Sequence, residues 1–230
     1  MCNTCSHKNS ITPLIVSYRT LEHSSIPSGL YAGISPLPER TEKHAAMEHS
    51  VESLSGRELL KMLISDVYGE GEQSYTTLKY EKPSAKLSGS VISVSFSHTA
   101  KSVSGIVSKE WVVGVDMESD SRTVSERLAK RMKHADESFK LYENNPIIRV
   151  WTMKEAALKA IGTGLRKPMN SVRIKPVKKH HFIVLFDNEI KAEIASFQKW
   201  DQWISICYIR PESTKTILSD EYVPIQTGRD

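Results

Sequence analysis

The sequence predicts an α+β fold, and three observations favour it. The stretch GRELLKMLISDVYG, residues 56–69, has the apolar spacing of an amphipathic helix. Residues 90–97, SVISVSFS, alternate between apolar and polar side chains as a half-buried strand does. Helical and strand-like runs come in separate groups along the chain instead of alternating as βαβ units, so we expect antiparallel sheets packed with helices.

The first half of the chain is expected to form one long helix and a small sheet. Apolar residues gather on one side of the helix, which Gly69 ends: Leu59, Leu60, Leu63, Ile64 and Val67. The other expected elements are a strand at 14–20, a helical stretch that opens at 36–43, a strand and turn at 76–85, and strands at 90–97 and 102–108.

The second half is expected to repeat this plan with a second long helix. A strand at 111–118 comes first, then a helix at 125–132 capped by Ser125, and a longer helix at 147–161 stopped by Gly162. Four strands of an antiparallel sheet follow, at 173–177, 181–187, 189–197 and 201–209. Each half thus supplies a long helix and a few strands, which is compatible with a pseudo-repeat of about 110 residues but does not establish one.

Composition limits the classes of function. The chain has 230 residues with a net charge of +4, which fits an anionic ligand or an acidic partner. Nucleic acid binding is not indicated, because no basic run interleaved with aromatic residues appears in the sequence. No apolar run approaches the roughly 20 residues of a membrane span, and the first 15 residues lack the apolar centre expected of a secretory signal. Three cysteines favour a reducing cytoplasm, and Cys2, Cys5 and His7 lack the second pair that a zinc site needs.

Two carboxylates near the end of an apolar strand are the first candidate site. Asp116 and Glu118 in VGVDME point to the same face of the strand, about 7 Å apart, and repel each other. A divalent cation such as Mg²⁺ would relieve the repulsion, since it takes a few carboxylates and completes its shell with water and phosphate oxygens. The alternative is an exposed strand end with two ordinary acids.

The nonamer WTMKEAALK, residues 151–159, is the second candidate. Glu155 and Lys159 share one helix face, either as a surface salt bridge or as a third metal ligand and a phosphate contact. Lys154 faces elsewhere, as a second anion contact or as plain surface. His98 ends the strand in FSHTAKS, and it is either a surface residue or a group held beside a phosphate.

Taken together and in this order, the motifs resemble the 4′-phosphopantetheinyl transferase superfamily. That family shows an S-H pair, then a (V/I)-G-(V/I)-D-x-E strand, then W-(S/T/C)-x-K-E-(A/S)-x-x-K on a helix, and all three are matched here. KYEKP at 79–83 is similar to the family's Y-G-K-P, with Glu81 in place of the glycine. GRELLKML at 56–63 resembles a helix of the long, monomeric members. The resemblance therefore implies two similar α+β halves, a pseudo-dimer, with domains at residues 1–108 and 109–230.

The resemblance implies an enzyme that moves the phosphopantetheine arm of coenzyme A to a serine of an apo acyl or peptidyl carrier protein, releasing adenosine 3′,5′-bisphosphate. It also assigns roles. Mg²⁺ would be held by Asp116, Glu118 and Glu155, and the pyrophosphate by Lys159. Other coenzyme A contacts would be Ser97 and His98 at a phosphate, Lys82 and Pro83 along the adenine, Arg57 near the 3′-phosphate, and Lys154 at a second anion position.

Two further expectations complete the hypothesis. Glu155 is the candidate base for the carrier serine, directly or through a water. Apolar residues of the helix at 125–132 and its start either dock the acidic recognition helix of the carrier or pack inward: Val124, Leu128 and Met132, with Arg127, Lys130 and Arg131 as charged neighbours.

Two rival functions stay open. One is another Mg²⁺-dependent phosphoryl or nucleotidyl transferase acting on a nucleotide-like substrate, and the other is a non-catalytic RNA-binding module.

Overall fold

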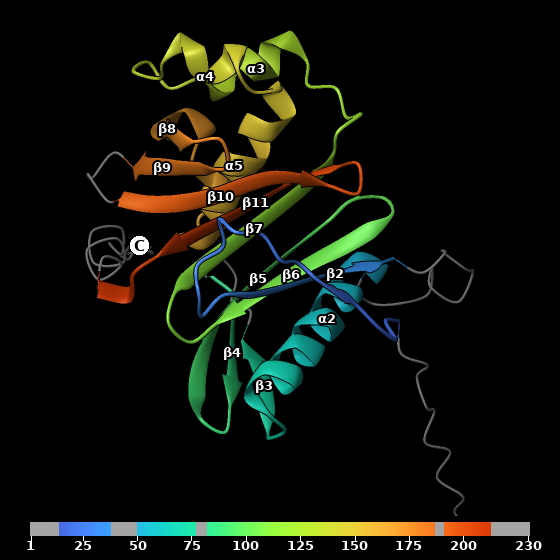
Figure 1. The fold of residues 1–230 in the computed structure, drawn as a ribbon. Coiled ribbons are helices and arrows are strands. Elements are labelled where there is room, and N and C mark those ends of the chain that lie inside the picture. The colour runs from blue at the N-terminus through green and yellow to red at the C-terminus, as the bar shows by residue number, and fades with distance from the viewer. Residues whose placement is uncertain (1–13, 38–49, 77–81, 187–190, 213–230) are drawn as a thin grey trace, which may run out of the picture.

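Two antiparallel sheets and a few helices make up the fold, which confirms the predicted α+β class (Figure 1). The computed structural model describes residues 14–37, 50–76, 82–186 and 191–212. The first sheet has the order β1-β2-β6-β5-β4-β3 and the second has the order β7-β11-β10-β9-β8. The pseudo-dimer relation of the two halves and their division into two domains stay predictions.

The elements have the following bounds. The strands of the first sheet are β1 Arg19–Thr20, β2 Tyr31–Pro36, β3 Gln73–Thr76, β4 Ser84–Leu87, β5 Ser90–His98 and β6 Ser102–Ser108. Those of the second sheet are β7 Val112–Ser119, β8 Val172–Lys178, β9 His181–Phe186, β10 Lys191–Lys199 and β11 Gln202–Ile209. The helices are α2 Val51–Tyr68, α3 Glu126–Met132, α4 Phe139–Glu143 and α5 Ile147–Ala160, followed by the short 3-10 turns η1 Gly164–Arg166 and η2 Met169–Ser171.

Three apolar clusters give the molecule four layers. Leu59, Leu60 and Leu63 of α2 pack against one face of the first sheet. The other face of that sheet packs against the second sheet, where Ile106 of β6 meets Val115 of β7 in a shared cluster. The far face of the second sheet is covered by α5, so the order of layers is helix, sheet, sheet, helix.

Helix ends follow from local chemistry. Ser50 caps α2, since its hydroxyl oxygen accepts the backbone N–H of Ser53 at 3.2 Å, so the helix begins five residues before the predicted start. Helix α5 ends at Ala160 and is capped by Ile161, and the following Gly162 has a φ of 78°, in the left-handed region that favours glycine. The N–H groups of Gly162 and Thr163 return to the carbonyls of Lys159 and Leu158, which fixes the last turn of α5.

Some predicted elements need correction. The strand at 14–20 is reduced to the two residues of β1, and β3 lies at 73–76, ahead of the expected position. Neither β2 nor α4 was predicted. The YAGISP segment of β2 has little polar alternation because its four middle residues are buried. The helical stretch from 36–43 is largely outside the described residues, and Cys2, Cys5, His7 and Glu81 are wholly outside them.

Serine hydroxyls join the two sheets at β5 and β7. Ser93 and Ser95 of β5 accept the backbone N–H groups of Val113 and Val115 at 3.0 and 3.1 Å. Two residues further on, Ser97 donates its hydroxyl to Asp116 at 2.8 Å. Among the described strands, β7 pairs with β11 alone, so the hydroxyls of Ser93 and Ser95 satisfy two N–H groups on its other edge.

Candidate active site

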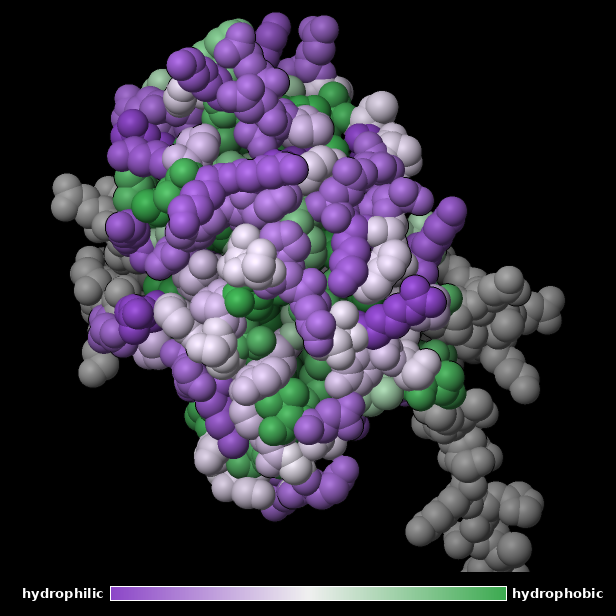
Figure 2. Space-filling view, viewed as in Figure 1, coloured by the Kyte–Doolittle hydropathy of each residue, from purple (hydrophilic) through white to green (hydrophobic). Residues whose placement is uncertain are grey.

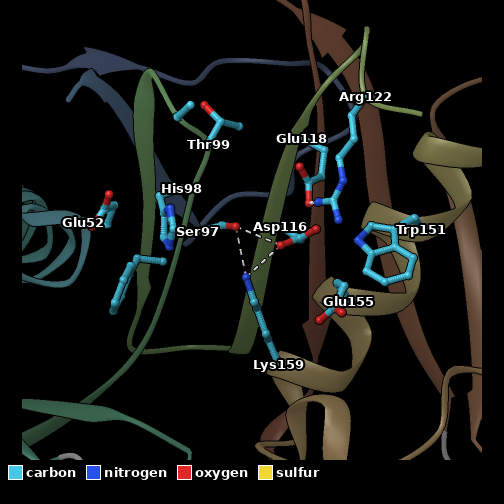
Figure 3. Close-up of a pocket in the computed structure, with 12 residues that line it drawn as sticks. Glu52, Ser97, His98, Thr99, Asp116, Glu118, Arg122, Trp151, Glu155 and Lys159 are labelled. Carbon is cyan, nitrogen blue, oxygen red and sulfur yellow. Dashed lines mark hydrogen bonds and ion pairs between the residues drawn. The ribbon is translucent and has the colours of Figure 1, made fainter. Parts of the chain in front are cut away.

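A pocket of about 700 Å³ opens where β5, β7, α5 and the start of α2 meet (Figure 3). All of the acidic residues singled out from the sequence line it, together with the Ser-His pair and Lys159. The lining residues are Glu52, Phe96, Ser97, His98, Thr99, Ala100, Asp116, Glu118, Arg122, Trp151, Glu155 and Lys159. The two motifs that are distant in sequence, VGVDME and WTMKEAALK, therefore meet at one place.

Gly114 allows this meeting, because α5 passes directly over it. A Cβ at position 114 would lie 2.2 Å from the carbonyl oxygen of Ala156 and 2.5 Å from the backbone nitrogen of Ala160. These atoms belong to the helix backbone, which cannot turn aside as a side chain can. The close approach sets Glu155 of α5 beside Asp116, two residues beyond the glycine on the same face of β7.

Asp116 is buried and held on one side only. Its Oδ1 accepts the Ser97 hydroxyl at 2.8 Å and the Lys159 ammonium at 2.8 Å (Figure 3). Its Oδ2 is buried without a hydrogen-bond partner. Lys159 therefore bonds to Asp116 and to Ser97 at 3.0 Å, instead of forming the surface pair with Glu155 that was the simpler expectation.

Glu155 is buried next to a second carboxylate. Its pKa is raised to about 7, first by burial and then by the charge of Asp116, while Lys159 and Arg122 oppose the shift. Both the protonated and the ionised form of the side chain are thus accessible near neutral pH. It is able to take up or give up a proton there, which an ordinary exposed glutamate does not do.

Glu118 has a partner that was not predicted. Arg122, in the turn after β7, donates Nη1 to Glu118 Oε1, and its guanidinium lies 5.4 Å from the ring centre of Trp151. Arg122 and Trp151 thus form one wall of the pocket (Figure 3). Spacing offered one signal for Arg122, since it lies four residues after Glu118, and Trp151 is the first residue of the helix motif.

The donor set fits a divalent cation chemically but is not gathered around one. Within the ranges that the structure describes, no group of three or more His, Cys, Asp and Glu side chains is arranged to hold a metal ion. The unpartnered Oδ2 of Asp116 and the raised pKa of Glu155 both indicate negative charge that an Mg²⁺ ion would stabilise. Arg122 is bonded to one oxygen of Glu118, Oε1, and would compete with an ion for this carboxylate.

A second, smaller pocket of about 210 Å³ lies beside the first and shares Phe96 and Lys159 with it. Lys82 and Pro83 line it, as does Gly162. The ammonium of Lys82 points inward, where it donates to the carbonyls of Val94 at 3.3 Å and Lys159 at 3.4 Å, and to that of Val113. Only the aliphatic stem of Lys82 is therefore offered to the pocket.

The other predicted ligand contacts divide into two groups. Ser97 and His98 line the large pocket, Ser97 buried and His98 exposed. Arg57 lies in α2 and lines neither pocket. The 3′-phosphate role of Arg57 therefore has no support from its position, whereas Glu52, one α2 turn earlier, does reach the large pocket.

The structure corrects the prediction that Lys154 is an anion contact or a surface residue. Its side chain is fully buried, where Nζ pairs with Glu137 at 2.8 Å and donates to the carbonyl of Val172 at 2.7 Å. Glu137 also accepts the Ile174 N–H at 2.8 Å and the Tyr142 hydroxyl. Lys154 is thus neither a surface residue nor placed to meet an anion in the pocket, because it ties α5 to the α3–α4 segment and to β8.

The predicted docking helix is only partly exposed. Met132 is buried, so the inward-packing alternative is right for it, while Val124 and Leu128 are half-buried. The basic residues Arg127, Lys130 and Arg131 are largely exposed, and Figure 2 shows hydrophilic side chains gathered over α3 and α4. The exposed apolar residue of this region is Phe139 of α4, at 70%.

Residues 112–209 match the family model described as the 4′-phosphopantetheinyl transferase superfamily. The match spans the chain from β7 to β11, which confirms for this part the resemblance that the motifs predicted and supports phosphopantetheinyl transferase activity in general. The match includes the three carboxylates and Lys159. No curated protein matches the chain.

Proposed function

We propose that the protein transfers the 4′-phosphopantetheine group of coenzyme A to a serine of an apo acyl or peptidyl carrier protein. The observation that carries the proposal is the meeting of the diacid strand and the KEAALK helix in one pocket, with Asp116, Glu155 and Lys159 side by side. The family match of residues 112–209 supports it. We further propose that the enzyme acts as a cytoplasmic monomer.

The reaction makes one bond and breaks one. The serine oxygen bonds to the phosphorus that carries the pantetheine arm, and the bond from this phosphorus to the bridging diphosphate oxygen breaks. Adenosine 3′,5′-bisphosphate leaves with the negative charge. A site for this step must stabilise charge that grows on phosphate oxygens and must receive the serine proton.

The carboxylates would supply the cation site. Asp116, Glu118 and Glu155 would hold Mg²⁺, and the ion, when bound, neutralises charge on the diphosphate. Lys159 stands beside them and supplies a fixed positive charge through Nζ, which Ser97 and Asp116 orient. A lysine whose direction is set in advance costs little reorganisation when the leaving group departs.

Glu155 would receive the serine proton. Its pKa of about 7 matches the operating pH, where a base is most effective. A bound cation lowers the basicity of this carboxylate, so transfer through a water is the version we favour.

The two adjoining pockets suggest how coenzyme A would lie. The small pocket, with the stem of Lys82, Pro83 and Phe96, offers an apolar cleft for the adenine ring. The large pocket holds the charged side chains and would take the diphosphate near His98 and Lys159. Carrier docking would use the exposed basic residues of α3, with Phe139 as the apolar contact, because carrier recognition helices are acidic.

The direct test is a mass measurement on the carrier. The protein is incubated with coenzyme A, Mg²⁺ and apo carriers from fatty acid, polyketide and nonribosomal peptide synthesis. We expect at least one carrier to gain a phosphopantetheine, to lose that gain with Asp116→Asn, and to keep it with Glu70→Gln, which removes an exposed acid beyond α2.

The rival nucleotidyl or phosphoryl transferase gives a different result. It would consume nucleotides with no carrier present, and none of the carriers would gain mass. That outcome would overturn the proposal.

A further inference from the structure

The proposed reaction gives Glu118 a role as a metal ligand, but it gives none to Arg122, with which Glu118 forms an ion pair. Arg122 lies in a turn closed by its own backbone N–H, which donates to the Ser119 carbonyl at 3.1 Å. The turn brings the guanidinium back over the end of β7, where it binds Glu118 and lies against Trp151. Arg122 thus lines the pocket beside the carboxylates, although its side chain stays partly exposed.

The two cations of the pocket divide the carboxylates between them. Lys159 is bonded to Asp116, and Arg122 to Glu118. Glu155 has neither as a bonded partner, although both lower its pKa from nearby. A divalent ion that used all three carboxylates could bind Asp116 through its unpartnered Oδ2 and leave Lys159 in place, but at Glu118 it would meet the charge of Arg122.

Of the two cations, Arg122 is the one built to move. Its side chain is 44% exposed and that of Glu118 is 16% exposed, so water is available to both when they part. Lys159 and Asp116 are more enclosed, at 28% and 7%, and Ser97 ties them further. Partly exposed ion pairs are weak, and the face of Trp151 gives the guanidinium a place to rest without Glu118.

We propose that Arg122 is a built-in counter-ion that holds Glu118 in the free protein and that a divalent cation displaces. It is a positioning residue, since it keeps Glu118 aimed into the pocket and sets the cation concentration at which the site fills. The inference rests on the proposed metal site. It adds to the three carboxylates a competition between Arg122 and the divalent cation for Glu118.

The competition is measured by Mn²⁺ titration, with free Mn²⁺ followed by electron paramagnetic resonance and no coenzyme A present. Arg122→Gln removes both the rival for Glu118 and a nearby positive charge, so we expect about fivefold tighter Mn²⁺ binding. Arg122→Lys, which keeps the charge, should bind close to wild type. The matched control is Arg210→Gln, since Arg210 is also an exposed arginine stacked on a tryptophan, Trp111, away from the pocket.

A second readout follows Trp151 itself. In wild type, Mg²⁺ should change the tryptophan emission as the guanidinium loses Glu118, and the change should be absent in Trp151→Phe and in Arg122→Gln. An emission change that persists in Arg122→Gln would contradict the exchange.

The outcomes separate this inference from the function. If wild type binds Mn²⁺, Asp116→Asn weakens the binding, and Arg122→Gln behaves as Arg210→Gln does, only the counter-ion role is overturned. If wild type does not bind Mn²⁺, or Asp116→Asn leaves its binding unchanged, the metal site fails and the counter-ion role fails with it.

Discussion

At the scale of single residues, Glu155 carries the property that most distinguishes the pocket from an ordinary acidic surface. Burial and the neighbouring Asp116 raise its pKa to about 7. Unfolding restores the normal pKa of 4.5. The unfolded chain therefore releases this proton at a lower pH than the folded protein does, and stability depends on pH between the two values.

Stability should accordingly fall as pH rises from about 4.5 to about 7 in the absence of divalent cations. Below this window Glu155 is protonated in both states and contributes nothing, and above it the folded state bears the full cost of a buried charge. Glu155→Gln should be more stable than wild type by about 2 to 3 kcal/mol at pH 8, and the gap should close by pH 4.5. Urea unfolding with EDTA at both pH values measures the gap, and equal gaps at both would refute the assignment.

Lys154 is the residue for which sequence motif and structure disagree. Its charge is internal, paired with Glu137, and Lys154→Met would leave that carboxylate buried without a cation. We expect a loss of about 3 to 5 kcal/mol in unfolding free energy, against little change for the exposed Lys61→Met. Coenzyme A affinity, measured well below the melting temperature, should be unchanged. A variant with normal stability and lost affinity would restore the anion-contact role.

At the scale of elements, the crossing of α5 over β7 positions the site, and Gly114 decides how close the two come. A methyl group there meets helix backbone. Gly114→Ala should therefore cost about 3 kcal/mol and separate Glu155 from Asp116, which lowers activity beyond the loss of stability. Gly105→Ala is the matched comparison, because a Cβ at 105 meets only the ends of Leu59 and Leu60 at 3.2 to 3.3 Å. Equal effects of the two substitutions, seen in urea unfolding, would contradict this account.

Elements with strong periodicity were predictable from the sequence, and so were the motifs on them. The alternation in β5 and the apolar face of α2 each reflect one buried face, which is a local property. β2 was missed because both of its faces are covered, and α4 because five residues carry too little pattern. The burial of Lys154 depends on Glu137 in another segment, and no local pattern near WTMKEAALK contains that information.

The site was predictable to the same extent. Asp116, Glu118, Glu155 and Lys159 were found from motif spacing, and the structure brings them to one pocket. Motif spacing could not predict how these side chains pair, because Lys159 forms its ion pair with Asp116 of β7 and not with Glu155 on its own helix. That choice depends on the approach of α5 to β7, which is a tertiary property.

At the scale of the whole molecule, the two sheets are joined by hydroxyl groups as well as by the apolar cluster between them. Ser95→Ala would leave the N–H of the fully buried Val115 without its partner. We expect a cost of about 1 to 3 kcal/mol, compared with almost none for the exposed Ser90→Ala in the same strand. Thermal unfolding of the two variants measures the difference, and equal melting temperatures would show that the edge of β7 is satisfied in another way.

The arrangement of sheets also explains why the pocket contains residues from both halves of the chain. β5 ends at the pocket and supplies Ser97 and His98, β7 supplies the diacid, and α5 closes the third side. The first sheet and α2 thus contribute to the site, although the family match covers only residues 112–209. None of the helices in the described ranges is long and apolar enough to cross a membrane.

The most direct test of the central claim is diffraction from crystals grown with Mn²⁺ and coenzyme A, using the anomalous signal of manganese to locate the ion. We expect one ion among the carboxylates of Asp116, Glu118 and Glu155, with a diphosphate oxygen of coenzyme A completing its shell at about 2.1 Å. An ion bound elsewhere, or a diphosphate lying outside this pocket, would contradict it.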